Sequence, residues 1–124
     1  MESVKRFEDL TCWKSARSLV KIIYEISQTG ELSRDWDAKS QIRRAALSVM
    51  NNIAEGFGRF QSKDSLRFYD IAKSSAYEVK SMLYVLEDVG YLSEDQLIKI
   101  RQLTDTTLLL TIGWIRYLSQ KQPI

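Results

Sequence analysis

The stretch LSEDQLIKIRQLTDTTLLLTIGWIRYL, residues 92–118, carries the clearest helix signal in the sequence. Ser93 and Gln96 have the spacing of a capping box, in which each side chain hydrogen-bonds the backbone of the other residue at a helix start. The residues that follow repeat every three or four positions and so share one helical face. That face consists of Leu97, Ile100, Thr104, Thr107, Leu108, Thr111, Ile115 and Leu118. We therefore predict a helix over residues 94–120.

Three further helices are predicted upstream, over residues 10–28, 35–57 and 63–89, because apolar residues recur there with the same spacing. Residues that favour helix ends stand between them. They are Gly30 after the first helix, Ser33 or Asp35 before the second, Gly56 and Gly58 at its end, Ser62 before the third, and Gly90 after it. No segment alternates with the two-residue period of a strand.

Chain length and the short connections decide how these helices pack. At 124 residues the chain is long enough for one core and no linker divides it, so we expect a single domain over residues 1–124. Short connections make consecutive helices antiparallel. The prediction is an all-α, antiparallel, up-down-up-down four-helix bundle.

Two of the predicted helices carry more apolar surface than one bundle seam needs. The apolar arc of the first helix spans about 200°, whereas a seam needs roughly 100°. In the fourth helix, residues 108–115 are apolar on nearly every side. The surplus residues are Leu19, Ile22, Ile26, Leu109 and Ile112. Either the first helix is deeply buried or the surplus surface packs against another subunit, and we expect such association.

A polar stripe follows one edge of the second helix. Its members step by three or four residues and are therefore neighbours on the helix surface. They are Gln41, Arg44, Ser48, Asn52, Glu55 and Arg59. Three interpretations stay open: a solvated face with local ion pairs, a hydrogen-bonded seam between subunits, or a surface that contacts nucleic-acid phosphates and bases. Charged stripes most often face solvent.

A second stripe, on the third helix, interleaves aromatic and basic side chains. It consists of Tyr69, Lys73, Tyr77, Lys80 and Tyr84, which we expect on the outside of the helix. Aromatic rings among lysines can stack bases and neutralise phosphates, but exposed tyrosines are also common in protein interfaces. We favour the protein interface, because Leu66, Asp70 and Glu87 on the same stripe dilute its positive charge.

The residue inventory argues against catalysis and against a bound metal or cofactor. No histidine is present, which removes the commonest general base, the commonest zinc ligand and every Ser-His or Cys-His pair. Cys12 is the only cysteine, so neither an internal disulfide nor a thiolate cluster can form. The glycine-containing run 55–59 follows a helix rather than a strand, so we interpret it as a helix stop and not as a phosphate loop. We expect a protein that is not an enzyme and needs no cofactor.

Charge and hydropathy limit the partners. The formal net charge of +2 permits contact with nucleic acid without requiring it. The first residues lack the apolar core of a signal peptide, and the longest apolar run, 108–115, is too short to cross a bilayer. We therefore expect a cytoplasmic protein with no membrane partner.

Three groups of motifs carry a family resemblance. They are Gln41-Ile42-Arg43-Arg44-Ala45-Ala46-x-Ser48 with Asn52-Ile53-Ala54-Glu55-Gly56 and Arg59, Phe7-x-Asp9-Leu10 with Trp13 and Ala16, and Ile71-Ala72-x-x-Ser75-x-x-Glu78. In these motifs, which are distributed over nearly the whole chain, the sequence resembles the four-helix-bundle proteins encoded in intervening sequences of bacterial 23S ribosomal RNA genes. One departure is Ser74, where the family commonly has glycine.

The resemblance implies a ring-shaped homopentamer with no established enzymatic activity. A structurally similar relative is the accessory protein of diversity-generating retroelements, which partners a reverse transcriptase and contacts nucleic acid. By this analogy Arg43, Arg44, Arg59 and Lys63 are candidate nucleic-acid residues, and Asn52 of the polar stripe is a further candidate. We expect a homo-oligomeric accessory protein that binds RNA or DNA. The alternative is a scaffold that docks another macromolecule, such as a nucleic-acid-processing protein, through its tyrosine stripe.

Overall fold

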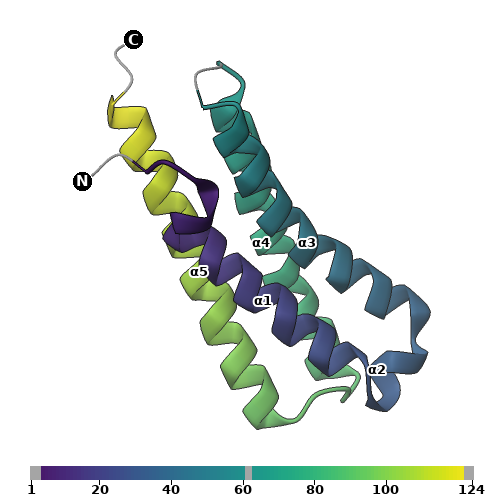
Figure 1. The fold of residues 1–124 in the computed structure, drawn as a ribbon. Helices are drawn as coiled ribbons and strands as arrows, with labels where there is room; N and C mark the ends of the chain where they lie inside the picture. Colours follow the sequence, from purple (N-terminus) through teal and green to yellow (C-terminus); the bar gives the residue numbers. More distant parts are fainter. Residues whose placement is uncertain (1–3, 61–62, 122–124) are drawn as a thin grey trace.

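The structure, a computed structural model, describes residues 4–60 and 63–121, and all regular secondary structure in these residues is helical (Figure 1). The elements are the 3₁₀ turn η1 (Phe7–Asp9) and the helices α1 (Thr11–Ser27), α2 (Gly30–Arg34), α3 (Trp36–Gly58), α4 (Ser65–Asp88) and α5 (Glu94–Lys121). The long helices α1, α3, α4 and α5 pack together, and each runs opposite to the long helix before it (Figure 1). The predicted all-α four-helix bundle is confirmed.

Side-chain caps fix the starts of α3 and α5. The Ser93 backbone N–H donates to Gln96 Oε1 at 2.9 Å, and the Gln96 N–H donates to Ser93 Oγ at 3.2 Å, so the predicted capping box is present. At the start of α3, Asp35 Oδ1 accepts from the Ala38 N–H at 3.1 Å. The sequence left Ser33 and Asp35 as alternative caps for this helix. Ser33 lies inside α2, and Asp35 is the residue that caps α3.

The connection between α1 and α3 is itself helical, which the sequence did not lead us to expect. Gly30 has the left-handed backbone expected after α1, with φ +67°, but α2 begins at this residue. Leu32 is only 1% exposed, so α2 serves to bury this side chain in the core. Gly90, with φ +74°, follows the end of α4 as predicted. The predicted cap Ser62 lies outside the described residues.

Of the two glycines predicted at the end of this helix, Gly58 is the last residue of α3, whereas Gly56 lies inside the helix, so the prediction is wrong for Gly56 alone. A Cβ atom on Gly56 would lie 2.9 Å from Tyr69 Cε1 and Cζ of α4. The Ser65 hydroxyl also donates to the Gly56 carbonyl at 2.9 Å. Glycine is used here because it lets α4 and the ring of Tyr69 approach the backbone of α3.

The buried side chains form two clusters along the bundle. One cluster, at the end of the bundle where α1 begins and α5 ends, includes Trp13, Val49, Ile53, Tyr69 and Trp114. The other cluster includes Leu19, Ile23, Ile42, Leu83 and Ile100. Because α1 packs against both α3 and α5, its wide apolar arc is largely buried within one chain.

Three buried threonines of α5 are satisfied locally. The hydroxyls of Thr104, Thr107 and Thr111 donate to the carbonyls four residues earlier, at 2.7, 2.8 and 2.8 Å. Ser15 Oγ of α1 lies 2.6 Å from Thr107 Oγ1. Since the Thr107 proton is already used, Ser15 must be the donor of that bond. The polar groups of this seam therefore leave α1 and α5 free to pack closely.

Candidate nucleic-acid and partner surfaces

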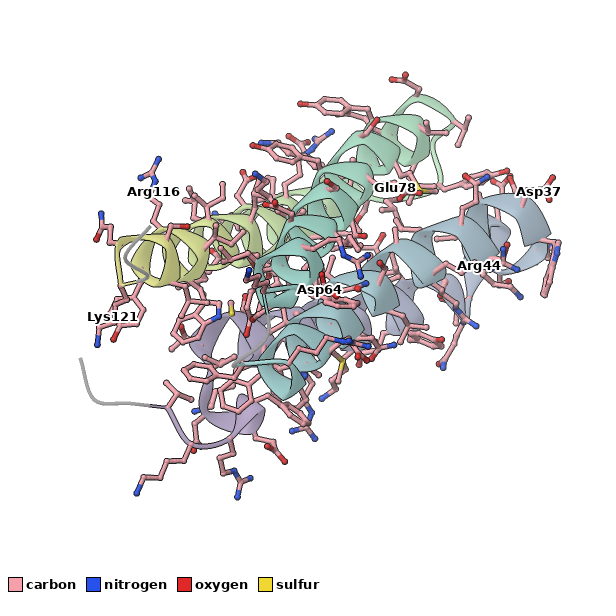
Figure 2. The ribbon with its side chains drawn as sticks, turned by 90° about the horizontal axis from the view of Figure 1, so that it is seen from above. Asp37, Arg44, Asp64, Glu78, Arg116 and Lys121 are labelled. Carbon is pink, nitrogen blue, oxygen red and sulfur yellow. The ribbon has the colours of Figure 1, made fainter. Side chains whose placement is uncertain are left out.

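The polar stripe of α3 divides into a bonded middle and exposed ends. Ser48 Oγ lies 2.7 Å from Ser75 Oγ of α4. Asn52 Nδ2 donates to the Ser48 carbonyl at 2.9 Å and to its hydroxyl at 3.0 Å. These half-buried groups join α3 to α4 within one chain. Arg44, by contrast, is exposed and makes no hydrogen bond, ion pair or ring contact with the described part of the chain (Figure 2).

Arg43 is engaged inside the bundle. Its Nε donates to Ser27 Oγ of α1 at 2.7 Å, and its guanidinium carbon lies 4.3 Å from the ring centre of Tyr24. The Ser27 hydroxyl in turn donates to the Tyr24 carbonyl at 3.1 Å. Arg43 therefore ties α3 to α1. It does not belong to an exposed face, and neither does Asn52.

Cations gather around an aromatic ring where α3 ends and α4 begins. The guanidinium carbons of Arg59 and Arg67 lie 4.8 and 4.7 Å from the ring centre of Phe68, within cation–π range. Arg59 Nε also donates to Glu55 Oε2 at 2.9 Å, so part of its charge is neutralised. Lys63, four residues before Arg67 in the chain, is exposed. We call Arg59, Lys63, Arg67 and Phe68 the turn cluster.

Tyr69 is fully buried, so the expectation that it lies on the outside of α4 is wrong. Its ring packs edge-on against Trp114 of α5, with ring centres 6.1 Å apart. Burial raises the pKa of its phenol, which keeps the hydroxyl neutral. The physical reason is helical phase: Tyr69 and Tyr77 are eight residues apart, which rotates one from the other by about 80°.

The outer seam of α4 and α5 is closed by ion pairs. Lys80 Nζ lies 3.0 Å from Asp105 Oδ1, and this hydrogen bond raises the pKa of Lys80. Arg101 Nη2 lies 2.8 Å from Glu87 Oε1, and the guanidinium lowers the pKa of Glu87. The same guanidinium covers the ring of Tyr84, 4.7 Å from its centre. The positive charge that the tyrosine stripe offers is therefore largely neutralised.

The predicted interface residues differ in exposure. Three are buried in the bundle and cannot reach a partner in this fold: Leu19, Ile26 and Tyr69. Two are half-buried and pack against the core: Ile22 and Ile112. Three are exposed, at 51%, 54% and 68%: Tyr77, Tyr84 and Leu109. The available apolar surface therefore lies on α4 and α5 rather than on α1.

A row of cations on α1 was not predicted. Lys14, Arg17 and Lys21 are exposed on the outer face of the helix. The sequence did contain a signal, because no acidic residue occurs between Asp9 and Glu25. This signal is an absence of acids, and it does not stand out as an aromatic or a mixed polar stripe does.

A second unpredicted feature is a hollow at the junction of α2 and α3. It has a volume of about 580 Å³ and is lined by Glu31, Arg34, Asp35, Trp36, Asp37 and Tyr91. Trp36 is 68% exposed there. The Tyr91 hydroxyl donates to Asp35 Oδ2 at 2.9 Å, which joins the α4–α5 connection to the cap of α3. This bond makes the hollow part of the scaffold that orients α3.

The cysteine and the carboxylates of the described residues were also considered as a nucleophile and as metal ligands. Burial raises the pKa of the Cys12 thiol to about 12, so it is not a nucleophile near neutral pH. Among residues 4–60 and 63–121, no three Cys, Asp or Glu side chains are grouped so that they could hold a metal ion. No helix in the same two segments combines the length and apolar character needed to span a membrane.

The fold and these surfaces define a class: small four-helix-bundle proteins that present cations and aromatic rings on their outer helix faces. The sequence model of the 23S rRNA-intervening sequence protein family matches residues 8–113. The chain belongs to this family, and the resemblance stated from the motifs is confirmed.

A solved structure shares the fold. It is the crystal structure of a protein of unknown function from the S23 ribosomal protein family of Bacteroides thetaiotaomicron. The two chains superpose with a TM-score of 0.76 at 21% sequence identity, over 85% of this chain and 95% of that one. No curated protein matches the chain.

Proposed function

We propose that this protein is a non-enzymatic accessory protein that binds RNA or DNA and acts as a homo-oligomer. The observation that carries the proposal is the turn cluster, in which two guanidinium groups lie 4.8 and 4.7 Å from the ring centre of Phe68. Surfaces that bind single-stranded nucleic acid combine aromatic rings that stack on bases with cations that neutralise phosphates. Membership of a family named after 23S rRNA intervening sequences supports RNA as the first ligand to test.

Arg44 extends the proposed surface along α3. Fifteen residues separate Arg44 from Arg59, which is about 22 Å along a helix. Because Arg44 has no partner in the described chain, its contact with a phosphate would break no existing ion pair. Arg59, Lys63 and Arg44 are therefore the residues that we assign to phosphate binding.

The proposed oligomer is the pentamer that the family resemblance implies, and the exposed side chains of α4 and α5 support association. The Lys80–Asp105 pair shows which residues of these antiparallel helices lie at the same level. Tyr77, one turn before Lys80, is therefore level with Leu109, one turn after Asp105. Both side chains are more than half exposed, at 51% and 68%. A partner that covered both would bury two large apolar side chains at one level of the bundle.

The test is RNA binding as a function of salt, measured by fluorescence anisotropy on a short labelled RNA. We expect the affinity of the wild-type protein to fall steeply with salt, because bound phosphates release counterions. Arg44→Ala with Arg59→Ala should weaken binding. The matched control, Arg34→Ala with Lys73→Ala, removes the same charge from α2 and α4 and should bind nearly as the wild type does. Absent or salt-insensitive binding at low ionic strength would contradict the proposal.

The second candidate function is a protein-interaction scaffold without nucleic-acid contact. The exposure of Tyr77 and Tyr84, on a face whose cations are paired, favours it. Here a pull-down should recover one protein partner, and Tyr77→Ala should lose that partner. Thr106→Ala, on the exposed face of α5, is the control that should retain it.

A further inference from the structure

The outer face of α1 is a row of unpaired cations. Lys14, Arg17 and Lys21 are exposed and lie three and four residues apart, so they occupy one face of the helix. None of them forms an ion pair with a carboxylate in residues 4–60 or 63–121. Six other cations of the protein do form such pairs. We call Lys14, Arg17 and Lys21 the α1 cation row.

The free protein gains nothing from this arrangement. Like charges three or four residues apart on a helix repel each other. The helix dipole adds to the cost, because it disfavours cations near an N-terminus, and α1 has no acid in its first turn. Lys14 and Lys21 make no hydrogen bond, ion pair or ring contact with the described part of the chain, and the guanidinium of Arg17 lies over Trp13, 5.7 Å from the ring centre. A bound polyanion would remove the repulsion.

The groups next to the row carry both signs of charge. On one side, Arg43 of α3 lies over Tyr24 of α1. On the other side, Lys99 of α5 lines a hollow of about 240 Å³ together with Glu25, the only acid of α1. The face therefore carries cations alone from Lys14 to Lys21, and the one acid of α1, Glu25, follows about one turn after Lys21.

We propose that the α1 cation row is a second contact surface for the phosphate backbone of a nucleic acid, independent of base sequence. Lys14 and Lys21 are about 10 Å apart along the helix. This length corresponds to about three phosphates at the 3.4 Å spacing of one duplex strand. The row deepens the proposed nucleic-acid function and rests on it, but it lies on a different helix from the turn cluster.

An anionic membrane is the less suitable partner. Helices that bind membrane surfaces insert an apolar face between the lipids. The apolar face of α1 is buried in the bundle, with Leu19 and Ile23 wholly inaccessible, and no large apolar side chain of α1 is exposed. The row offers charge without an insertion surface, which fits a phosphate backbone that is bound from solution.

The experiment compares two variants that each change the formal net charge from +2 to −1. The first combines Lys14→Gln, Arg17→Gln and Lys21→Gln in the α1 cation row. The control combines Arg34→Gln, Lys73→Gln and Lys80→Gln on α2 and α4. The probe is a labelled uridine homopolymer RNA of 20 nucleotides, titrated at several salt concentrations. A plot of the logarithm of affinity against the logarithm of salt counts the neutralised phosphates.

The α1 variant should give a plot shallower by about 2, because each single-strand phosphate contact contributes about 0.7. Its loss of affinity relative to the wild type should therefore be about 15-fold smaller at 200 mM salt than at 50 mM salt. The control should change the slope by less than half as much. In addition, RNA should raise the thermal midpoint of the wild type more than that of the α1 variant. Without RNA, the α1 variant should be at least as stable as the wild type, which excludes misfolding.

Three outcomes would overturn the inference. If the wild type binds RNA and the α1 variant keeps its slope, the row is not a phosphate surface, and the proposed function stands on the turn cluster alone. If the wild type does not bind RNA at low salt, the proposed function fails and the inference fails with it. If the α1 variant loses binding to anionic phosphatidylserine vesicles and keeps RNA binding, the row recognises a lipid surface instead.

Discussion

Gly56 shows how one residue sets the distance between two helices. It is buried inside α3, and the ring of Tyr69 occupies the space that any larger side chain would need. The Ser65 hydroxyl holds the Gly56 carbonyl from the first turn of α4. Close packing at this point positions Arg59 and Phe68, which follow Gly56 and precede Tyr69 in the chain. The turn cluster therefore depends on a glycine that makes no contact with a ligand.

Gly56→Ala should lower the free energy of unfolding by about 1–3 kcal/mol, the usual cost of overpacking a core. The new methyl group would lie 2.9 Å from two ring carbons of Tyr69, a side chain with no room to move. This cost should exceed the gain of at most about 1 kcal/mol that alanine brings to a helix interior. Urea unfolding followed by circular dichroism measures the difference.

Gly113→Ala is the matched control within α5. No atom lies within 4 Å of the Cβ position at Gly113, and the residue is exposed. Alanine should therefore stabilise the protein by about 0.5–1 kcal/mol. Equal effects at the two glycines would contradict the role that we give to Tyr69.

At the scale of a helix, local capping chemistry fixes where α5 begins. Ser93→Ala should remove the hydrogen bond to the Gln96 N–H and lower the free energy of unfolding by about 1 kcal/mol. Ser119→Ala, near the exposed C-terminal end of the same helix, should have little effect. The measurement is the urea midpoint of unfolding of the two variants. An unchanged midpoint for Ser93→Ala would show that tertiary packing alone sets this helix start.

The start of α3 has a pH-dependent contribution. Hydrogen bonds from the Ala38 N–H and the Tyr91 hydroxyl hold the pKa of Asp35 below its ordinary value of 3.8. Ionised Asp35 therefore favours the folded state above that pH, and the contribution is lost as the pH falls through the lowered pKa. Asp35→Asn keeps a capping oxygen without the charge. We expect it to flatten the decline in thermal midpoint below about pH 4, where Asp normally titrates.

The helices and their caps were predictable because their signals are local. The spacing of Ser93 and Gln96, or the position of Asp35 before an apolar run, depends on residues within one turn. The burial of Tyr69 was not predictable, because it depends on Gly56 in another helix and on a phase difference of about 80° from Tyr77. The short helix α2 was not predicted, because it too depends on tertiary packing: it places Leu32, which is 1% exposed, in the core.

The candidate surfaces were predictable only in part. Arg44 and Lys63 are exposed as expected. Arg43 and Asn52 carry polar groups of the same kind, but α1 and Ser48 use them for bonds within the bundle. A sequence cannot distinguish a free guanidinium from an engaged one, since the partner Ser27 lies sixteen residues away on another helix.

At the scale of the whole molecule, α1 and α5 both have a surplus of apolar residues in sequence, but they differ in how much of that surplus the fold buries. The wide apolar arc of α1 is filled by α3 and α5, so it does not require a second subunit. The apolar stretch of α5 is buried only in part, and Leu109 is 68% exposed. The outer face of α1 is basic, whereas the outer faces of α4 and α5 offer tyrosines and Leu109. These properties favour α1 for a polyanion and α4 with α5 for another protein subunit.

Leu109→Glu should therefore lower the mass of the protein in solution at micromolar concentration, measured by light scattering. A carboxylate placed in an apolar subunit contact would lose its hydration without gaining a partner, which disfavours the assembled state. Ile98→Glu is the control, because Ile98 is also exposed, at 50%, but lies in the first turns of α5, far from the level of Tyr77. A wild-type protein that is monomeric, or a Leu109→Glu variant with unchanged mass, would remove α5 from the proposed interface. In the second case the exposed tyrosines of α4 would be the next residues to substitute.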